Sequence, residues 1–190
     1  MKRDELRKII VGPMATVATP LDSEYKVDYG KMHDLTNWWI DNGLKTGNSV
    51  IKVAAAMGEG PQLRDTEWPH LLRTTVQASK GRVPIMCGIH YKDTIRAIED
   101  IKLASDLGAV GVQLSAPIHN GPTEDDNLRF YEDVSKAIDF GRGVDSGSVL
   151  PIRFRREGRG LWSRAGFRAG GYPGVLHVPE VADRRICPRC

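Results

Sequence analysis

The sequence contains little cysteine and no long apolar stretch, and both features narrow the class of protein. Its three cysteines, Cys87, Cys187 and Cys190, do not form the disulfide framework of a small secreted domain. No apolar run approaches the roughly 18 residues that a membrane-spanning helix requires. The charged first five residues do not lead into the apolar segment of a signal peptide. We therefore expect a cytoplasmic protein without a membrane partner.

Lysine is missing from the end of the chain, where Lys136 is the last one. From Gly141 onward there are 10 arginines and 4 acidic residues, a balance of +6. Residues 1–140 carry 17 basic and 20 acidic residues, a balance of −3, and the whole chain has a formal charge of +3. Nine of the 20 glycines also lie in the last 50 residues. This change in composition predicts a body over residues 1–140 and an Arg/Gly-rich tail over residues 141–190.

The body repeats a pattern in which a short apolar run is followed by an amphipathic segment. The apolar runs predict strands, and the segments with helical spacing predict helices. The expected strands are residues 11–18, 50–55, 83–88 and 110–115, and the expected helices begin at about residues 28, 66, 94 and 123. Strands that alternate with helices form parallel sheets with right-handed crossovers. The sequence therefore predicts an α/β fold with four consecutive β/α units.

The apolar positions also predict which side of each helix faces the sheet. Asp28 and Thr123 are suitable N-caps for the first and fourth helices. The residues expected to face inward are Met32, Leu35, Trp39 and Ile40; Trp68, Leu71, Leu72 and Val76; Ile95, Ile98, Ile101 and Leu103; and Leu128, Tyr131, Val134 and Ile138.

The second predicted strand and the turn after it form the segment on which the function depends. Residues 50–55 are apolar except at Lys52, as expected for a strand that is buried on both faces of a parallel sheet. A glycine-rich turn follows at residues 58–61, and the carboxyl ends of such strands carry the chemistry of α/β proteins. We expect the Lys52 stem to pack in the sheet and its amine to reach solvent or a carboxylate such as Glu59. A role of Lys52 as a nucleophile is the alternative.

Several short motifs occur in a fixed order between residues 9 and 140. They are residues 17–22 with 27–29, Gly58-Glu59 with Pro61 and Leu63, residues 81–85 with Gly88, residues 107–109, and Pro117, Asn120 and Pro122-Thr123. In order and spacing these motifs resemble the dihydrodipicolinate synthase / N-acetylneuraminate lyase family. The resemblance implies a (β/α)₈ TIM barrel, of which this body would be the first four β/α units. The chain of 190 residues is shorter than the roughly 250 residues typical of that fold.

The same resemblance implies the chemistry of a class I aldolase, a lyase that acts on 2-oxo acids such as pyruvate. In the family a lysine forms a Schiff base with the 2-oxo acid, a tyrosine relays protons, and the imine serves as an electron sink. Neither a cofactor nor a metal is implied, and family members can form homo-oligomers. The residues of this sequence that would line the substrate site are Thr19, Ala56, Met57, Gly58, Glu59, Pro117 and His119. Glu59 is expected to hold the loop and not to perform catalysis.

Two stretches of this site depart from the family pattern. Ala56 and Met57 replace a pair of threonines, so recognition of the substrate carboxylate would fall to backbone N–H groups. Either the substrate carries an apolar group near Met57, or Met57 only fills space. Ile118 and His119 replace two tyrosines. His119 is either an acid–base group, because histidine titrates near neutrality, or a solvated loop residue.

The largest departure follows the fourth predicted helix. The family places its catalytic tyrosine on a fifth strand and its Schiff-base lysine on a sixth. In this sequence no strand with the tyrosine pattern follows Phe140, and no lysine remains. We therefore predict that the chain alone is inactive as a lyase. The alternative is a non-catalytic fragment, or a partner that assembles with a complete homologue.

The tail allows two interpretations. A stretch that is rich in arginine and glycine and free of lysine is typical of a GC-rich gene read out of frame, and such a segment would be disordered. The competing hypothesis is a basic segment that binds nucleic acid, in which Trp162, Phe167 and Tyr172 stack on bases. The final CxxC has only His177 nearby, which is short of the four ligands of a structural zinc site. No metal is therefore expected.

Overall fold

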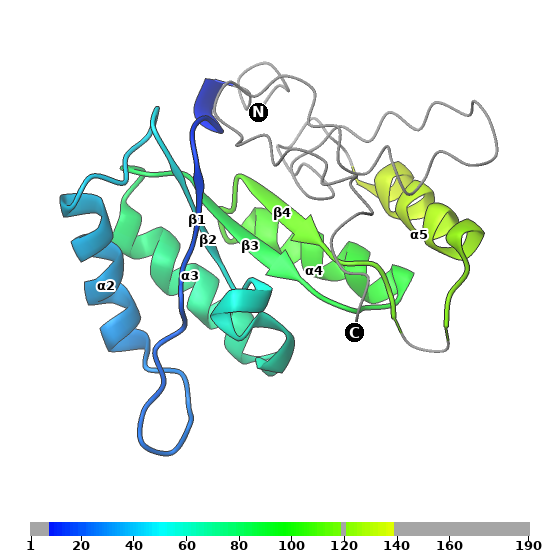
Figure 1. The fold of residues 1–190 in the computed structure, drawn as a ribbon, viewed down its shortest axis with the longest axis horizontal. Helices are drawn as coiled ribbons and strands as arrows, with labels where there is room; N and C mark the ends of the chain where they lie inside the picture. Colours follow the sequence, from blue (N-terminus) through cyan, green and yellow to red (C-terminus); the bar gives the residue numbers. More distant parts are fainter. Residues whose placement is uncertain (1–7, 119–120, 139–190) are drawn as a thin grey trace, which may run out of the picture.

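The computed structural model of the chain describes residues 8–118 and 121–138. Within these ranges four strands form one parallel sheet in the order β1-β2-β3-β4 (Figure 1). The strands are β1 (Met14–Thr16), β2 (Val50–Val53), β3 (Ile85–Ile89) and β4 (Gly111–Leu114). All four predicted strands are confirmed, and each is shorter than predicted. The predictions made for the tail and for His119 lie outside the described residues.

A helix follows each strand. The α-helices are α2 (Tyr29–Asp41), α3 (Glu67–Ser79), α4 (Thr94–Asp106) and α5 (Glu124–Ala137), and the short 3₁₀ helices η1 (Ala56–Gly58) and η2 (Gly60–Gln62) lie between β2 and α3. Helices α2, α3 and α4 cover one face of the sheet in the same order as the strands (Figure 1). Consecutive units of a (β/α)₈ barrel have this arrangement, whereas a doubly wound sheet reverses its strand order. No helix in the described ranges is long and apolar enough to cross a membrane.

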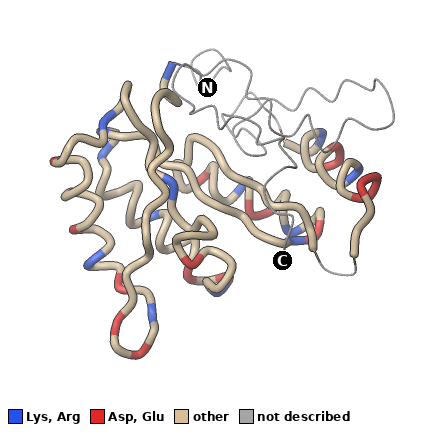
Figure 2. The backbone as a smooth tube through the Cα atoms, viewed as in Figure 1, with Lys and Arg blue, Asp and Glu red and all other residues tan. Residues whose placement is uncertain are grey.

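Both predicted N-caps are confirmed. At the start of α2 the Asp28 carboxylate accepts a hydrogen bond from the Lys31 backbone N–H at 2.8 Å. At the start of α5, Thr123 Oγ1 accepts from the Asp126 N–H at 3.2 Å, and the Thr123 N–H donates to the Asp126 carboxylate at 3.0 Å. This reciprocal pair is a capping box, which satisfies backbone donors at the helix start. Acidic residues occupy the first turn of α5, which is coloured red in Figure 2, and their negative charge interacts favourably with the helix dipole.

Three of the four helices bury the faces that the apolar pattern predicts. The residues predicted to face inward that are buried in these helices are Met32, Ile40, Trp68, Leu71, Leu72, Val134 and, directly after α5, Ile138. Trp39, Val76 and Tyr131 are partly buried and pack against the same core. The sequence pattern missed Phe130, which is only 5% exposed.

The packing of α4 differs from the prediction. Ile95 is 69% exposed and Leu103 is 39% exposed, although both were expected to face the sheet. The buried residues of α4 are Ala97, Ile101 and Ala104, which lie on one helical face at spacings of four and three residues. The prediction is confirmed for Ile101, and Ile98 packs against the core. It was wrong for Ile95 and Leu103 because it was chosen from the large apolar side chains, whereas α4 also approaches the sheet through alanines.

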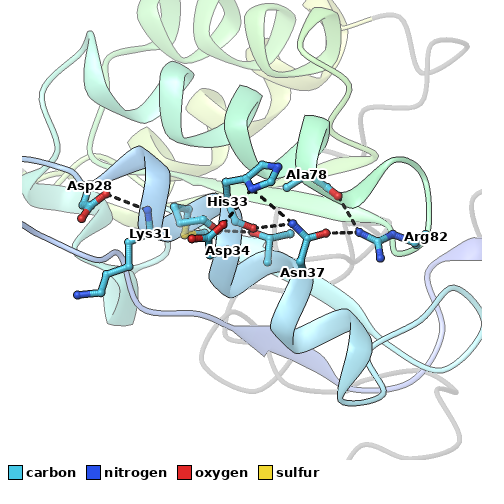
Figure 3. Close-up of polar contacts among 9 residues, drawn as sticks. Asp28, Lys31, His33, Asp34, Asn37, Ala78 and Arg82 are labelled. Atoms are coloured by element: carbon cyan, nitrogen blue, oxygen red, sulfur yellow. Dashed lines mark hydrogen bonds and ion pairs between the residues drawn. The ribbon is translucent and has the colours of Figure 1, made fainter.

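Arg82 connects α2 with the end of α3 (Figure 3). Its Nη2 donates to the Ala78 carbonyl at 2.9 Å and to Asn37 Oδ1, and its Nη1 lies 3.7 Å from the Asp41 carboxylate. Asn37 donates to the His33 carbonyl, one helical turn earlier, at 3.0 Å. These groups lie at the surface, where an ion pair contributes little free energy. The main effect of the guanidinium is therefore to fix two neighbouring helices relative to each other.

The two faces of the sheet carry different side chains, because residues alternate along each strand. The face toward the helices contributes to the main apolar core Ile51, Val53, Ile85, Cys87, Ile89, Val112 and Leu114. On the opposite face, Val50 and Met86 form a separate small apolar cluster with Ile10. Nearer the carboxyl ends of the strands, alternation and register place on this opposite face Thr16, Lys52, Gly88 and Gln113. We call it the inner face, since it is the face that lines the interior of a closed barrel.

Cys87 is predicted to be unreactive toward thiol reagents while the chain is folded. Its side chain is fully buried on the helix side of β3, and this burial raises the pKa of the thiol to about 12. In a Cys187→Ser, Cys190→Ser variant we expect no reaction with Ellman's reagent under native conditions. The same variant in guanidinium chloride should release one equivalent of thiol. Rapid labelling of the native variant would contradict the burial of Cys87.

Candidate functional site

The loops after β1 and β2 meet at the carboxyl ends of the strands. Thr19 is only 8% exposed, and its Oγ1 donates a hydrogen bond to the Gly58 carbonyl at 2.6 Å. A Cβ atom on Gly58 would lie 2.4 Å from the Val17 carbonyl oxygen, so only glycine fits this close approach. The structure thus brings together two of the residues that the sequence predicts for the substrate site.

The turn after β2 uses its own backbone donors. The N–H groups of Gly58 and Gly60 both donate to the Ala55 carbonyl, at 2.8 and 2.9 Å. These two N–H groups are therefore engaged within the turn. The Gly58 and Gly60 N–H groups are therefore not the backbone donors that were predicted to hold the substrate carboxylate.

The side chains at the tip of the turn point into solvent. Met57 is 82% exposed. Ala56 is exposed as well. Glu59 has a left-handed backbone with φ 59°, and its carbonyl accepts hydrogen bonds from the Gln62 and Leu63 N–H groups at 2.8 and 3.1 Å. Through its backbone, Glu59 holds the loop, as the sequence led us to expect.

The loop after β4 is described only in part. Pro117 is half-buried and Ile118 is 58% exposed. His119 and Asn120 lie outside the described residues, so a site role for His119 stays a prediction.

Lys52 has a different partner from the one predicted. Its amine donates to Gln113 Oε1 at 2.5 Å, and not to Glu59. Lys52 is on β2 and Gln113 is on β4, so the contact crosses the strand between them. The register places Met86 of β3 beside Lys52 and Gly88 of β3 beside Gln113. Burial lowers the pKa of Lys52 below its ordinary value.

His90, directly after β3, forms a second contact across the inner face. Its Nε2 lies 2.9 Å from the Ala54 carbonyl oxygen and its Nδ1 lies 3.0 Å from Ser115 Oγ. Because a carbonyl can only accept, Nε2 carries the proton, and in the neutral ring Nδ1 accepts from the Ser115 hydroxyl. Burial lowers the pKa of His90, against the opposing effect of the Ala54 carbonyl, and the nearby Lys52 cation lowers it as well. The ring is therefore held neutral in one tautomer.

Sequence reasoning did not find His90, Gln113 or Ser115. Each lies at or just beyond a strand end, and the alternation of side chains places them with Lys52 on one side of the sheet. A polar residue at an inner-face position of a predicted strand is the signal that could have indicated them. The sequence alone does not give the register between strands, so it could not show that the side chains of Lys52 on β2 and Gln113 on β4 meet across β3.

A shallow pocket lies beside this cluster, between η2 and α4, and its lining includes Trp68, His90, Lys92 and Asp100. The Lys92 amine donates to the Asp65 carboxylate and lies 4.0 Å from that of Asp100. Within the described ranges, no group of histidine, cysteine and acidic side chains is placed to hold a metal ion.

Asp100→Asn is expected to stabilise the chain slightly at neutral pH. Burial raises the pKa of Asp100 above its ordinary value of 3.8, against the opposing effect of Lys92. A carboxyl whose pKa is raised in the folded state lowers stability as the pH rises through this range. We expect a gain of less than roughly 1 kcal/mol, because the group is partly solvated, and no gain below the carboxyl titration range. Thermal melts of the variant and the wild type at neutral pH and below the carboxyl titration range test this. A clear loss of stability of Asp100→Asn at neutral pH would show that the predicted direction is wrong.

The described fold is a run of four parallel β/α units whose loops assemble a polar site at the carboxyl ends of the strands. This is the place where (β/α)₈ barrel enzymes carry their active sites. The class of protein that the fold and the site define is therefore a (β/α)₈ barrel or a part of one.

Comparisons with known proteins identify the family. The model of the dihydrodipicolinate synthetase family matches residues 10–140. A 4-hydroxy-tetrahydrodipicolinate synthase of Aromatoleum aromaticum is 30% identical over 131 residues, covering 69% of this chain and 44% of that protein. A protein of the same name from Albidiferax ferrireducens is 31% identical over 179 residues, covering 92% of this chain and 56% of that protein.

Solved structures agree with the sequence comparisons. A dihydrodipicolinate synthase of Bacillus anthracis is 30% identical with a TM-score of 0.60, covering 68% of this chain and 44% of that one. The enzyme of Acinetobacter baumannii, solved as a complex with pyruvate, is 28% identical with a TM-score of 0.60, covering 72% of this chain and 48% of that one.

The chain belongs to the dihydrodipicolinate synthetase family. It spans about half the length of the curated relatives that it matches. The predicted fold, a partial (β/α)₈ TIM barrel, is confirmed.

Proposed function

We propose that this chain is the first half of a dihydrodipicolinate synthase-type lyase, which binds small 2-oxo acids such as pyruvate in the cytoplasm but does not convert them alone. The substrate would lie at the carboxyl ends of β1 to β4. Thr19, Ala56, Met57, Gly58, Glu59 and Pro117 would surround it, with His119 as the further candidate.

One observation carries the proposal: the site loops are assembled, and no lysine follows Lys136 in the sequence. Thr19 and Gly58 are locked together at 2.6 Å, and the turn closes on the Ala55 carbonyl. The last lysine of the sequence is Lys136 on α5, before the part of the barrel where the family resemblance places the Schiff-base lysine. A relative of 28% identity is a pyruvate complex, which supports pyruvate as the first ligand to test.

Binding and turnover measured side by side test this function. Saturation-transfer NMR with pyruvate should show binding to the full chain, and lactate at the same concentration serves as the comparison that lacks the keto group. A coupled assay of condensation with an aldehyde should show no turnover above buffer. Turnover by the chain alone would overturn the claim of inactivity, and absence of pyruvate binding would overturn the claim of a substrate site.

The second candidate function is that of an assembly partner, and the sheet edges favour it. In the described sheet β1 and β4 each have only one neighbour, and exposed strand edges pair readily with another chain. We expect the chain to bind the separately expressed second half of a complete homologue, such as the relative from Albidiferax ferrireducens. Lyase activity that appears only in the mixture would support this function. Two halves that elute separately in size-exclusion chromatography and remain inactive would contradict it.

A further inference from the structure

Two polar contacts cross β3 side by side on the inner face of the sheet. Lys52 on β2 reaches Gln113 on β4 at 2.5 Å. His90 spans the same gap nearer the strand ends, from the Ala54 carbonyl at 2.9 Å to Ser115 Oγ at 3.0 Å. The His90 contact depends on Gly88, because a Cβ atom there would lie 2.5 Å from His90 Nε2 and 2.4 Å from the Ala54 oxygen. The backbone is therefore shaped to hold this cluster.

Lys52 is the one charged residue of the four described strands. Among the described residues no carboxylate lies within ion-pair distance of its amine, whose partner is the neutral amide of Gln113. A half-buried cation without a counter-charge is costly, and a bound anion would offset that cost. Lys92, by contrast, has the acidic partners Asp65 and Asp100.

The surroundings of the amine add neutral donors and no competing negative charge. Gln113 accepts from Lys52 through Oε1, and within the described residues its amide N–H groups make no hydrogen bond, so they can donate to a ligand. Thr16 of β1 lies beside Lys52 in the register and brings a hydroxyl. A cation next to an amide and a hydroxyl in a partly dry site is suited to a carboxylate, which accepts charge-assisted hydrogen bonds.

We propose that Lys52 and Gln113 form the carboxylate subsite of this chain and hold the anionic end of a small 2-oxo acid. The inference rests on the proposed binding of 2-oxo acids and names the group that recognises them. The loop after β2 has no threonine hydroxyls at Ala56 and Met57, and its Gly58 and Gly60 N–H groups donate within the turn. A subsite at Lys52 and Gln113 supplies the carboxylate contacts that this loop does not. The binding is non-covalent, and His90 acts on the subsite as a positioning residue that keeps the space over Gly88 neutral.

The test compares pyruvate with its uncharged amide, pyruvamide, in NMR titrations of the full chain. Lys52→Met should weaken pyruvate binding about tenfold, the effect of one charge-assisted hydrogen bond, and leave pyruvamide unchanged. Gln113→Glu should act in the same direction, because it places a carboxylate beside the Lys52 amine while the lysine and its packing remain. Lys45→Met, at an exposed lysine before β2, is the matched control and should bind both ligands as the wild type does.

The outcomes separate this inference from the proposed function. If the wild type binds pyruvate and both site variants bind it as tightly as the Lys45→Met control, the subsite is wrong and the proposed function stands. If the wild type binds neither pyruvate nor pyruvamide, the proposed function itself fails, and the subsite with it. A circular-dichroism melt of each variant shows whether it is folded, and Gln113→Glu keeps the test decisive if Lys52→Met does not fold.

Discussion

Gly60→Ala is expected to prevent the chain from folding stably. A Cβ atom at this position would lie 1.9 Å from the Ala54 carbonyl oxygen and 2.9 Å from that of Ala55. Both are backbone atoms of the turn after β2, so they cannot move aside without displacing the strand end. We expect a loss of roughly 3 kcal/mol or more in the free energy of unfolding, a large share of the stability of a small domain. Urea unfolding followed by circular dichroism measures it.

Gly30→Ala is the matched control for that substitution. Gly30 lies in the first turn of α2, where the only neighbour of an added Cβ would be the Asp28 carboxylate at 3.5 Å. Alanine is favoured over glycine in a helix, so this variant should gain about 0.5–1 kcal/mol. If Gly60→Ala is as stable as Gly30→Ala, the tight turn described here does not exist in solution, and the site geometry built on it fails.

Ile101→Ala should destabilise the chain strongly, and Ile95→Ala should not. Ile101 is fully buried in α4 against the sheet, and truncating such a side chain typically costs about 2–5 kcal/mol through lost burial and the cavity left behind. Ile95 is 69% exposed on the same helix, so its replacement should change stability by less than about 0.5 kcal/mol. Both variants are measured by urea unfolding under identical conditions.

This pair also decides between the two possible faces of α4. The apolar pattern alone assigns both isoleucines to the core, whereas the structure buries Ala97 and Ala104 beside Ile101. Equal losses from Ile95→Ala and Ile101→Ala would mean that the helix is rotated toward the face that the sequence predicted. A large difference between them would confirm the face seen in the structure.

The sequence predicted the strand–helix order well, because apolar periodicity, caps and glycine stops are local signals. Asp28 and Thr123 show this most clearly, since each cap depends on a hydrogen bond only three residues away. The face of α4 was not predictable in the same way. Small residues such as Ala97 contribute little to an apolar pattern, and whether they are buried depends on how closely the helix approaches the sheet.

The candidate site was predictable where it depends on loops that follow neighbouring strands and not where it depends on strand register. The meeting of Thr19 with Gly58 follows from two loops at the same edge of a parallel sheet. The contact of Lys52 with Gln113 joins residues that are 61 positions apart and crosses the strand between them. No local sequence pattern indicates the contact between Lys52 and Gln113. The expectation that a carboxylate such as Glu59 would be the partner of Lys52 was therefore wrong.

A borohydride trapping experiment tests most directly the claim that this chain is a family half-barrel without the family's imine chemistry. The full chain is incubated with pyruvate, reduced with sodium borohydride and weighed intact by mass spectrometry, with a complete homologue treated in parallel. We predict a reduced pyruvate adduct on the homologue and none on this chain. An adduct that maps to Lys52, or to any other single lysine of this chain, would contradict the account, since it would show that the half-barrel forms the Schiff base by itself.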